Sequence, residues 1–361
     1  MAQTDPILAE TERLHAFFQS RGATSVETQL LQPANLLLDL YGEDIRARAY
    51  LTPDPLRGEL MLRPDYTVPV VQNHMQAGAT AASYTYAGKV FRKQETDIER
   101  ANEYIQVGYE IFGSRDPARA DAEIFTAMSQ ALEGLPLRVQ TGDMSVLMAA
   151  VSGLRTTDER KVALMRHIWR PQRFRFLLER YAGISPPLES RRALLAIKDP
   201  LAQGEPRIGI RSVTEIGDRI TRLRRDSEAA PISKTELDLL TAIMQLRETY
   251  PNILKQLKDL AVDLPTISEA IVRIEKRLEE IEKRGIDTST LMFEASFGRT
   301  SMEYYDGFVF GFYDNSGKDV SLIATGGRFD ALTRRLGNGS DLPAVGGIVR
   351  PDLLIKMRGQ V

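Results

Sequence analysis

The chain of 361 residues carries 47 lysines and arginines against 49 aspartates and glutamates, for a formal net charge of -2. The whole chain therefore has no basic footprint of the kind that nucleic-acid binders usually show, although a local basic patch stays possible. It has no cysteine, which excludes disulfides, thiolate metal sites and cysteine nucleophiles. Its three histidines, His15, His74 and His167, are too scattered for a metal-ligand pattern, so no metal or other cofactor is predicted.

The N-terminus carries acidic residues where a signal peptide needs an apolar core. No apolar run approaches the roughly 20 residues that a membrane-spanning helix needs. We therefore expect a soluble, cytoplasmic protein without a membrane segment. The length allows two domains, or one large domain with an insertion.

Apolar periodicity and turn residues predict several elements near the N-terminus. They are an amphipathic helix over 7–19, a short strand and a helix within 27–50 with a turn at Gly42, a strand over 60–62, and a helix over 68–75 with Pro69 in its first turn. Asp65 and Thr67 then lie beside a helix N-terminus. These two side chains are equally suited to capping the helix and to contacting a ligand.

Two runs rich in aromatic and β-branched residues, 84–92 and 104–112, predict a hairpin whose long loop is the charged segment 93–103. Alternation along the second strand puts one set of residues on one face and another set on the opposite face. The first set is Tyr104, Gln106, Gly108, Glu110 and Phe112, and the second is Ile105, Val107 and Ile111. Only the second face has the composition of a core.

A register that pairs Gly88 with Gly108 puts Tyr86 opposite Glu110 and leaves floor space for a small molecule above the glycines. A carboxylate and an amide fixed on strands, near Arg92, suit a ligand that bears an amine and a carboxylate. An amino acid fits this description. A sheet with one solvated face explains the same residues equally well.

Further along, a helix over 116–132 and a strand over 137–140 are predicted, and residues 156–290 are mostly helical. The clearest helix covers 268–283. Its apolar side chains recur at spacings of three and four, which favours burial against neighbouring helices over a partner-binding seam; they are Ile267, Ile271, Ile274, Leu278 and Ile281. Glu269 and Arg273 are placed to pair. Trp169 is suited to a pocket or to an interface.

A second hairpin is predicted from runs at 308–312 and 320–324, with a turn at 315–317. The glycines within 325–330 either let the backbone approach a ligand or form a strand-to-helix turn. A final helix starts at Pro351. Strands that flank a helical insertion indicate an α+β architecture built on an antiparallel sheet. Its predicted parts are a core over 1–155, the insertion over 156–290 and the rest of the core over 291–361.

Six blocks in chain order, LRPDYT, VFRKQ, YIQVGYEIFG, EYYDG, GGRFD and PAVGG, resemble the catalytic core of histidyl-tRNA synthetase, a class II aminoacyl-tRNA synthetase. The resemblance covers most of the chain. It implies that Arg92 matches the arginine of the second class II motif, which in the synthetases holds the ATP phosphate. Asp65 and Thr67 fall where the synthetases contact the amino group of histidine. Gln106 and Glu110 match residues that recognise the amino acid.

The resemblance also matches Tyr305 to a tyrosine of the same pocket, with Tyr304 beside it. The histidine-binding residues that it implies are Asp65, Thr67, Arg92, Gln106, Glu110, Tyr304 and Tyr305.

Several positions depart from the synthetase pattern. In the third motif, the position of the arginine that stacks on adenine is Leu353, within the sequence RPDL. The catalytic arginine falls at Thr300, with Arg299 one position away. Phe329 replaces the tyrosine of the GGRYD block, and the chain ends at Val361 where an anticodon-binding domain would begin. Because removing even one preorganised charge from such a site costs about 2.7 to 4 kcal/mol in the transition state, aminoacylation is not expected.

A synthetase-like core without ATP and tRNA equipment is similar to the regulatory subunits of the short-form ATP phosphoribosyltransferase, the first enzyme of histidine biosynthesis. In that family the synthetase-like protein has no catalysis of its own. It forms a hetero-octamer with the small catalytic subunit, which needs it for activity and for feedback inhibition by histidine. The resemblance implies the same for this chain, with no catalytic residues, no tRNA and a dimer face near 33–41.

Two other functions stay open. One is a truncated, histidyl-tRNA synthetase-like enzyme that activates an amino acid and transfers it to something other than full tRNA. The other is a histidine-dependent sensor of a different system. ATP–pyrophosphate exchange with histidine separates the enzyme from the regulatory subunit.

Overall fold

The computed structural model describes residues 5–41, 45–78, 80–94, 100–202, 209–299, 304–314 and 320–359. The strands are β1 (Thr24–Ser25), β2 (Leu31–Pro33), β3 (Leu51–Asp54), β4 (Gly58–Leu62), β5 (Ala82–Phe91), β6 (Glu103–Phe112), β7 (Leu137–Asp143), β8 (Arg247–Thr249), β9 (Met292–Glu294), β10 (Phe308–Asp314), β11 (Ser321–Arg328) and β12 (Ala344–Val349). The predicted turns at Gly42 and at 315–317 lie outside the described residues.

The helices of the core are α1 (Pro6–Ser20), α2 (Ala34–Tyr41), α3 (Ile45–Arg48), α4 (Thr67–Gln76), α5 (Pro117–Ala131), α6 (Met144–Ser152), α14 (Asp330–Leu336) and α15 (Pro351–Met357). Those between α6 and β9 are α7 (Asp158–Arg166), α8 (Pro171–Tyr181), α9 (Glu189–Ala196), α10 (Val213–Glu228), α11 (Lys234–Gln245), α12 (Tyr250–Asp263), the 3-10 helix η1 (Pro265–Ile267) and α13 (Ser268–Glu282). No helix among the described residues is long and apolar enough to cross a membrane.

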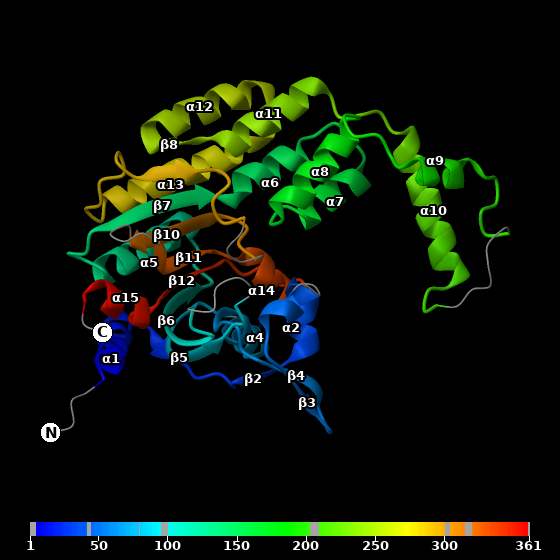
Figure 1. Cartoon of the computed structure of the whole chain (residues 1–361). Coiled ribbons are helices and arrows are strands. Elements are labelled where there is room, and N and C mark those ends of the chain that lie inside the picture. The colour runs from blue at the N-terminus through cyan, green and yellow to red at the C-terminus, as the bar shows by residue number, and fades with distance from the viewer. Residues whose placement is uncertain are drawn as a thin grey trace.

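A nine-stranded sheet in the order β1-β5-β6-β12-β11-β10-β7-β9-β8 forms the centre of the fold (Figure 1). Its six central strands, from β5 to β7 in this order, pair antiparallel with one another. The sheet becomes mixed toward its edges, because β1 is parallel to β5 and β9 is parallel to β7. A second sheet has the order β2-β4-β3. The predicted α+β architecture with a largely antiparallel sheet and flanking helices is confirmed.

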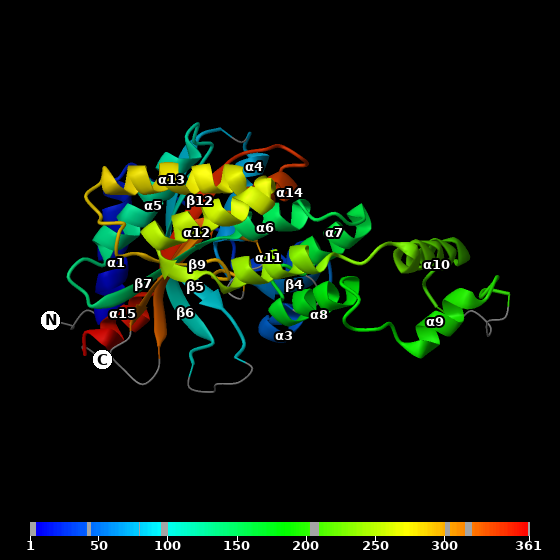
Figure 2. The ribbon, with the colours of Figure 1, turned by 90° about the horizontal axis from the view of Figure 1, so that it is seen from above.

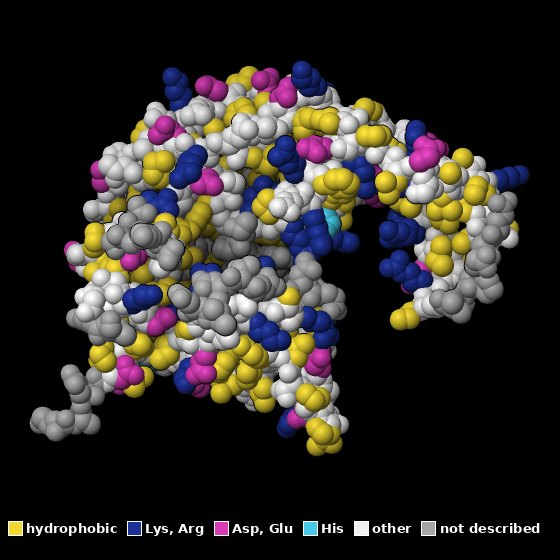
Figure 3. Space-filling view, in the orientation of Figure 1, with side chains coloured by type: hydrophobic (Ala, Val, Ile, Leu, Met, Phe, Trp, Pro, Cys, Tyr) yellow, Lys and Arg dark blue, Asp and Glu magenta, His cyan; other side chains and the backbone are white. Residues whose placement is uncertain are grey.

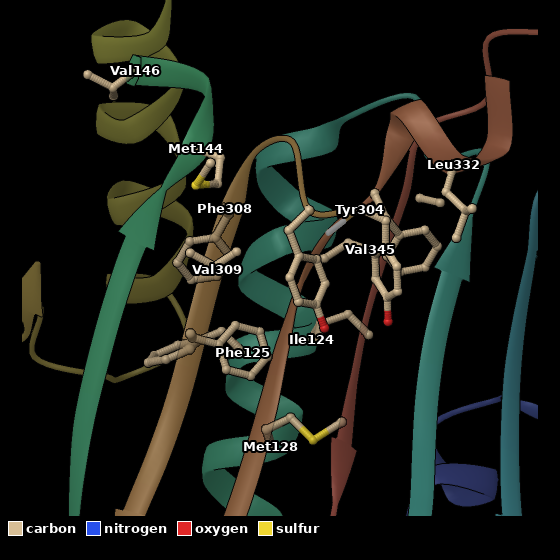
Figure 4. Close-up of a cluster of buried hydrophobic side chains, with 14 of the residues drawn as sticks. Ile124, Phe125, Met128, Met144, Val146, Tyr304, Phe308, Val309, Leu332 and Val345 are labelled. Atoms are coloured by element: carbon tan, nitrogen blue, oxygen red, sulfur yellow. The ribbon is translucent and has the colours of Figure 1, made fainter. Parts of the chain in front are cut away.

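Helix α5 covers one face of this sheet and forms the centre of the core. Phe125 packs its ring edge-on against Phe308 and Phe310 and stacks on Phe312, at centroid distances of 5.9, 5.5 and 5.7 Å. The three phenylalanines of β10 share a face because side chains two apart on a strand point the same way. Figure 4 shows Ile124, Phe125 and Met128 of the helix against the strands. The apolar side chains predicted for the helix over 116–132 therefore pack against the sheet.

Helix α13 begins at Ser268 as predicted and ends at Glu282, one residue before the predicted end, and each of the five predicted apolar positions from Ile267 to Ile281 is buried. This confirms that the apolar side chains are buried against neighbouring elements and do not form a seam for a partner. Glu269 and Arg273 pair at 3.1 Å on the exposed side. On the buried side, Arg277 forms ion pairs with Asp143 at 2.9 Å and with Asp121 at 3.4 Å. The helix is thus fixed to β7 and α5 by charges as well as by apolar contacts.

Residues 156–290 are mostly helical, as expected, but they are not separate from the core along their whole length. Strand β8 pairs with β9 and forms the last strand of the main sheet. In contrast, α9 and α10 project from the body as an arm (Figures 1 and 2). Among its described residues α9 buries none, and α10 buries Ile220 alone. Figure 3 shows a hollow between this arm and the body, with Lys and Arg side chains beside it.

Candidate functional site

The face of β6 that carries Gln106 and Glu110 is buried. Their side chains are 3% and 1% exposed, whereas Ile105 and Ile111 on the opposite face are only half-buried. The prediction that only the apolar face belongs to the core is therefore wrong, and so is a solvated polar face. Helix α4 and the side chains of neighbouring strands pack on the polar face, so the carboxylate and the amide lie inside the protein.

The predicted hairpin is present, but its predicted register is wrong by two residues. Gly88 lies opposite Gln106, and Tyr86 lies opposite Gly108. Tyr86 nevertheless reaches diagonally to Glu110, and its hydroxyl donates to Glu110 Oε1 at 3.0 Å. The diagonal contact is within the reach of a long aromatic side chain on neighbouring strands.

The space above the two glycines is filled by the protein's own rings, so the predicted floor for a ligand is not there. A Cβ at Gly108 would collide with the Tyr86 ring, and one at Gly88 would collide with the Tyr66 hydroxyl. These two tyrosines stack on each other with centroids 4.4 Å apart and planes 6° apart. Arg63 lies over the Tyr66 ring, 3.8 Å from its centroid, and donates to its hydroxyl.

Glu110 accepts two hydrogen bonds on a single oxygen. Thr67 Oγ1 donates to Oε1 at 2.8 Å, beside the bond from Tyr86. The pKa of Glu110 is raised to about 7, because burial and the charge of Asp65 together outweigh the two hydroxyl donors, which lower it. The carboxyl group thus changes charge near neutral pH, which is unusual for a structural glutamate.

Asp65 lies at the start of α4, where its Oδ1 accepts from the backbone N–H of Val68 at 3.2 Å. Capping and proximity to the site therefore occur together. Burial raises the pKa of Tyr305, and the charges of Asp65 and Glu110 raise it further, whereas Arg92 lowers it. Both carboxylates and Arg92 therefore lie close enough to Tyr305 for their charges to act on its hydroxyl.

The remaining predicted residues border this cluster. Arg92 follows β5 directly, and its Nε donates to the carbonyl of Pro64 at 2.7 Å, one residue before Asp65. Tyr304 packs edge-on against Tyr305 with centroids 4.9 Å apart, and against Phe329 at 6.0 Å. The structure thus gathers Asp65, Thr67, Arg92, Glu110, Tyr304 and Tyr305 around one region, with Gln106 on the same face of β6. Their part in histidine binding stays a prediction.

Two buried oxygen atoms of this region have no hydrogen-bond partner among the described residues. They are Glu110 Oε2 and Gln106 Oε1. A buried acceptor without a donor costs about 1 to 3 kcal/mol, and more when it is charged. Two such acceptors, four residues apart on one face of a strand, mark a place where a ligand that donates hydrogen bonds would restore the loss.

Glycines on neighbouring strands make room for these side chains. Gly346 of β12 lies opposite Glu110, and a Cβ there would be 2.6 Å from Glu110 Cγ. Gly327 of β11 does the same for Tyr305, at 2.8 Å from its ring. The glycines within 325–330 are therefore strand residues that admit the protein's own side chains, rather than a turn or a surface for a ligand.

The sequence profile of the histidyl-tRNA synthetase family matches residues 3–187 and 218–354. An ATP phosphoribosyltransferase regulatory subunit of Brucella canis (strain ATCC 23365 / NCTC 10854 / RM-666) is 30% identical over 380 residues, which cover 99% of this chain and 99% of the relative. The chain belongs to the family of ATP phosphoribosyltransferase regulatory subunits.

Solved structures with a similar fold cover almost the whole chain. A protein of Bacillus halodurans C, described as an ATP phosphoribosyltransferase regulatory subunit/histidyl-tRNA synthetase, has a TM-score of 0.68 at 20% identity and covers 99% of this chain and 81% of that chain. A histidyl-tRNA synthetase of Nostoc sp. PCC 7120 has a TM-score of 0.64 at 14% identity, over 98% of this chain and 72% of that chain. These likenesses establish the synthetase fold for the regulatory subunit. The interpretation of the chain as a regulatory subunit rather than an enzyme is confirmed by the names of its curated relatives.

In the region of this regulatory subunit that resembles the third synthetase motif, Arg350 makes two side-chain contacts. Arg350 lies over the Tyr104 ring, 3.7 Å from its centroid, and pairs with Asp352 at 2.5 Å. A guanidinium group on a ring face occupies the position from which another planar group would stack. Leu353, at the position of the synthetase arginine, is partly buried.

Arg299 is not in contact with Glu110 or Gln106 through any described interaction. It is buried, and its Nε donates to the carbonyl of Ile168 at 2.7 Å. Burial lowers the pKa of Arg299 to about 10. Thr300, where the catalytic arginine of the synthetases falls, lies outside the described residues.

Residues missed by the sequence analysis complete the surroundings of the site. They are Tyr66 and Arg63, which stack with Tyr86 above Gly88 and Gly108, and only the aromatic content of this segment signalled Tyr66. The described residues contain no cluster of three or more His, Asp or Glu side chains placed to hold a metal ion.

Proposed function

We propose that this regulatory subunit activates the short-form catalytic subunit of ATP phosphoribosyltransferase and mediates its feedback inhibition by histidine. The name of its full-length curated relatives supports a partnership with the catalytic subunit. The synthetase fold supports an amino acid as the effector, because that fold positions an amino-acid pocket on the sheet. The reaction then belongs to histidine biosynthesis, whose end product is the effector.

The observation that carries the effector site is the pair of unpartnered acceptors, Glu110 Oε2 and Gln106 Oε1, on the buried face of β6. Histidine offers an ammonium group with three donors and an imidazole ring with at least one. Its ammonium group suits the two carboxylates, Asp65 and Glu110. Its carboxylate suits Arg92, whose guanidinium influences the same Tyr305.

The proposed histidine-binding set is Asp65, Thr67, Arg92, Gln106, Glu110, Tyr304 and Tyr305. Thr67 and Tyr86 orient the Glu110 carboxylate by donating to Oε1, so that Oε2 is left for the ligand. Tyr305 borders the ligand with its ring. Feedback requires that histidine bind one state of the complex more tightly than another.

We also propose the assembly that the family resemblance implies. The subunit dimerises through its synthetase-like core, with 33–41 near the dimer face, and joins the catalytic subunit in a cytoplasmic hetero-octamer without tRNA. Size measurement of the purified mixture by light scattering tests this stoichiometry, and a stable complex of a different composition would contradict it.

Calorimetric titration with L-histidine tests the site. The wild-type chain should bind histidine, and Glu110→Ala should lose at least tenfold in affinity, because the ligand ammonium group loses a charge-assisted partner. Glu103→Ala is the matched control, since Glu103 lies on the same strand but is exposed and pairs with Lys89 at 2.5 Å. Equal affinity of wild type and Glu110→Ala would place the histidine site elsewhere.

Reconstitution tests the regulatory role. Adding this chain to the purified short-form catalytic subunit should raise phosphoribosyl transfer to ATP, and histidine should then inhibit it. The same chain should show no ATP–pyrophosphate exchange with histidine. Robust exchange would favour an amino-acid-activating enzyme instead, and failure to form or activate the complex would contradict the proposal.

A further inference from the structure

The single tryptophan of the chain contacts the backbone of the candidate site. Trp169 lies between α7 and α8, and its Nε1 donates to the carbonyl oxygen of Tyr305 at 2.9 Å. The indole N–H has no other use as a donor, and a partly buried indole usually finds a partner. The turn between α7 and α8 is therefore tied to the residue that borders the polar cluster.

A second hydrogen bond connects the same turn to Arg299. Arg299 Nε donates to the carbonyl of Ile168 at 2.7 Å, and its guanidinium lies over the ring of Phe174 of α8 at 4.8 Å. Arg299 is 5% exposed and has no carboxylate partner among the described residues. A buried cation without a counter-charge depends on such carbonyl and ring contacts. Replacing the protein contacts of residues 168 and 169 by water would therefore cost free energy.

The two helices that this turn joins, α7 and α8, contact the end of the arm that is nearer to the body. Arg160 of α7 pairs with Asp226 of α10 at 2.6 Å and donates to the carbonyl of Ala230 at 2.8 Å. Tyr181, at the end of α8, accepts from the backbone N–H of Ile232 at 2.9 Å. The pair α7 and α8 therefore contacts Tyr305 on one side and the base of α10 on the other, while the arm itself stands clear of the body (Figure 2).

We propose that Trp169 is a positioning residue that couples occupancy of the polar cluster to the orientation of α7 and α8, and so of the arm. The coupling rests on the proposed histidine site. A ligand that engages Asp65 and Glu110 beside Tyr305 would change the contacts that hold this tyrosine in place. The Tyr305 carbonyl cannot move without carrying the Trp169 indole or breaking its hydrogen bond. A continuous chain of contacts runs from Tyr305 through Trp169 to α7 and α8, and from these helices to the end of α10.

The experiment uses the full chain and L-histidine. Because Trp169 is the only tryptophan, its emission reports this contact without any label. Histidine should change the emission and saturate at the concentrations at which calorimetry shows binding. It should also change hydrogen exchange of the backbone amides in α8 and α10. Trp169→Phe keeps a ring but removes the donor, so it should lose about fivefold in affinity, the equivalent of one net hydrogen bond.

In Trp169→Phe, histidine should no longer change hydrogen exchange in α10. A melting temperature close to that of the wild-type chain is confirmed first, so that this loss cannot be attributed to unfolding. Arg175→Ala is the control, since Arg175 also lies on α8 but is exposed and pairs with Glu179 of the same helix. Binding heat with unchanged emission and unchanged exchange in α10 would overturn the coupling and leave the histidine site standing. Absence of binding heat would overturn the histidine site and the coupling with it.

Discussion

The hydroxyl of Thr67, the first residue of α4, donates to Oε1 of Glu110 in the middle of β6 across 2.8 Å. Both residues are buried, so water does not replace this bond when it is lost. The helix N-terminus and the strand therefore depend on each other through one carboxyl oxygen.

Replacing Thr67 by Val should test that dependence. The shape is kept, but a buried carboxyl group loses a donor, so the free energy of unfolding should fall by about 1 to 3 kcal/mol. Chemical denaturation measures the change. Thr221→Val is the control, because Thr221 only donates to the carbonyl of Gly217 on an exposed helix surface, and it should change stability by less than about 0.5 kcal/mol. Equal effects of the two substitutions would contradict the argument.

Glu110 should make stability depend on pH. Its pKa of about 7 in the folded chain exceeds the ordinary value of 4.5, so the native state keeps the proton over this interval and the unfolded state does not. The contribution of Glu110 to the free energy of unfolding is therefore fully present below pH 4.5. It is lost as the pH rises through about 7, and the total loss is about 3 kcal/mol.

Glu110→Gln keeps the acceptor for Thr67 and removes the charge. Its stability relative to wild type should rise between pH 4.5 and 8, measured by denaturation at each pH. Asp306, whose pKa is raised to about 7 by burial and by the charge of Asp330, contributes in the same interval. The difference between the two proteins isolates Glu110, and a difference that does not vary with pH would refute the assignment.

Several features of the site were predictable from sequence because they depend on local pattern. Alternation placed Gln106 and Glu110 on one face of a strand, and helix periodicity placed Asp65 and Thr67 at the start of α4. The family resemblance joined these segments, and the structure brings them together. The register was not predictable, because a loop as long as 93–103 does not fix which residues of the two strands lie opposite each other.

Other features were not predictable because they arise from contacts between distant segments. The sequence showed Arg277 as one of many charges on an amphipathic helix, and only the fold brings it to Asp121 and Asp143. Likewise, Trp169 was open to a pocket or an interface until its bond to Tyr305 placed it beside the site. Composition does not reveal that a glycine admits a neighbouring side chain rather than a ligand.

Breaking the buried ion cluster should be costly. Arg277→Met leaves Asp143 and Asp121 inside the protein with fewer cations, and removing one partner of a buried pair typically costs about 3 to 5 kcal/mol. Thermal and chemical denaturation measure the loss. Arg273→Met, four residues earlier on the same helix, removes only the exposed pair with Glu269 and should cost about 1 kcal/mol or less. A small effect at Arg277 would show that the cluster contributes little.

Gly346→Ala should disturb the site from the neighbouring strand. Its Cβ would lie 2.6 Å from Glu110 Cγ, so either the carboxylate or the strand must shift. Overpacking of this kind costs about 1 to 3 kcal/mol, and histidine affinity should fall as the carboxylate moves.

Gly217→Ala is the contrasting variant. The added Cβ meets only Leu201 at 3.8 Å on helix α10, so it should raise stability by about 0.5 to 1 kcal/mol. Calorimetry and denaturation of both variants check the pair. Unaltered histidine binding in Gly346→Ala would separate the effector from Glu110.

Strand β8 has a mechanical consequence. The chain leaves the main sheet after β7 and α6 and returns to it at β8, which is separated from β7 only by β9. Both ends of the intervening segment, 153–246, are thus held at one edge of the same sheet. A flap attached at two neighbouring points turns most easily about the line that joins them. A rotation of α7 and α8 about this line would move the arm at the far end further than the helices beside the sheet.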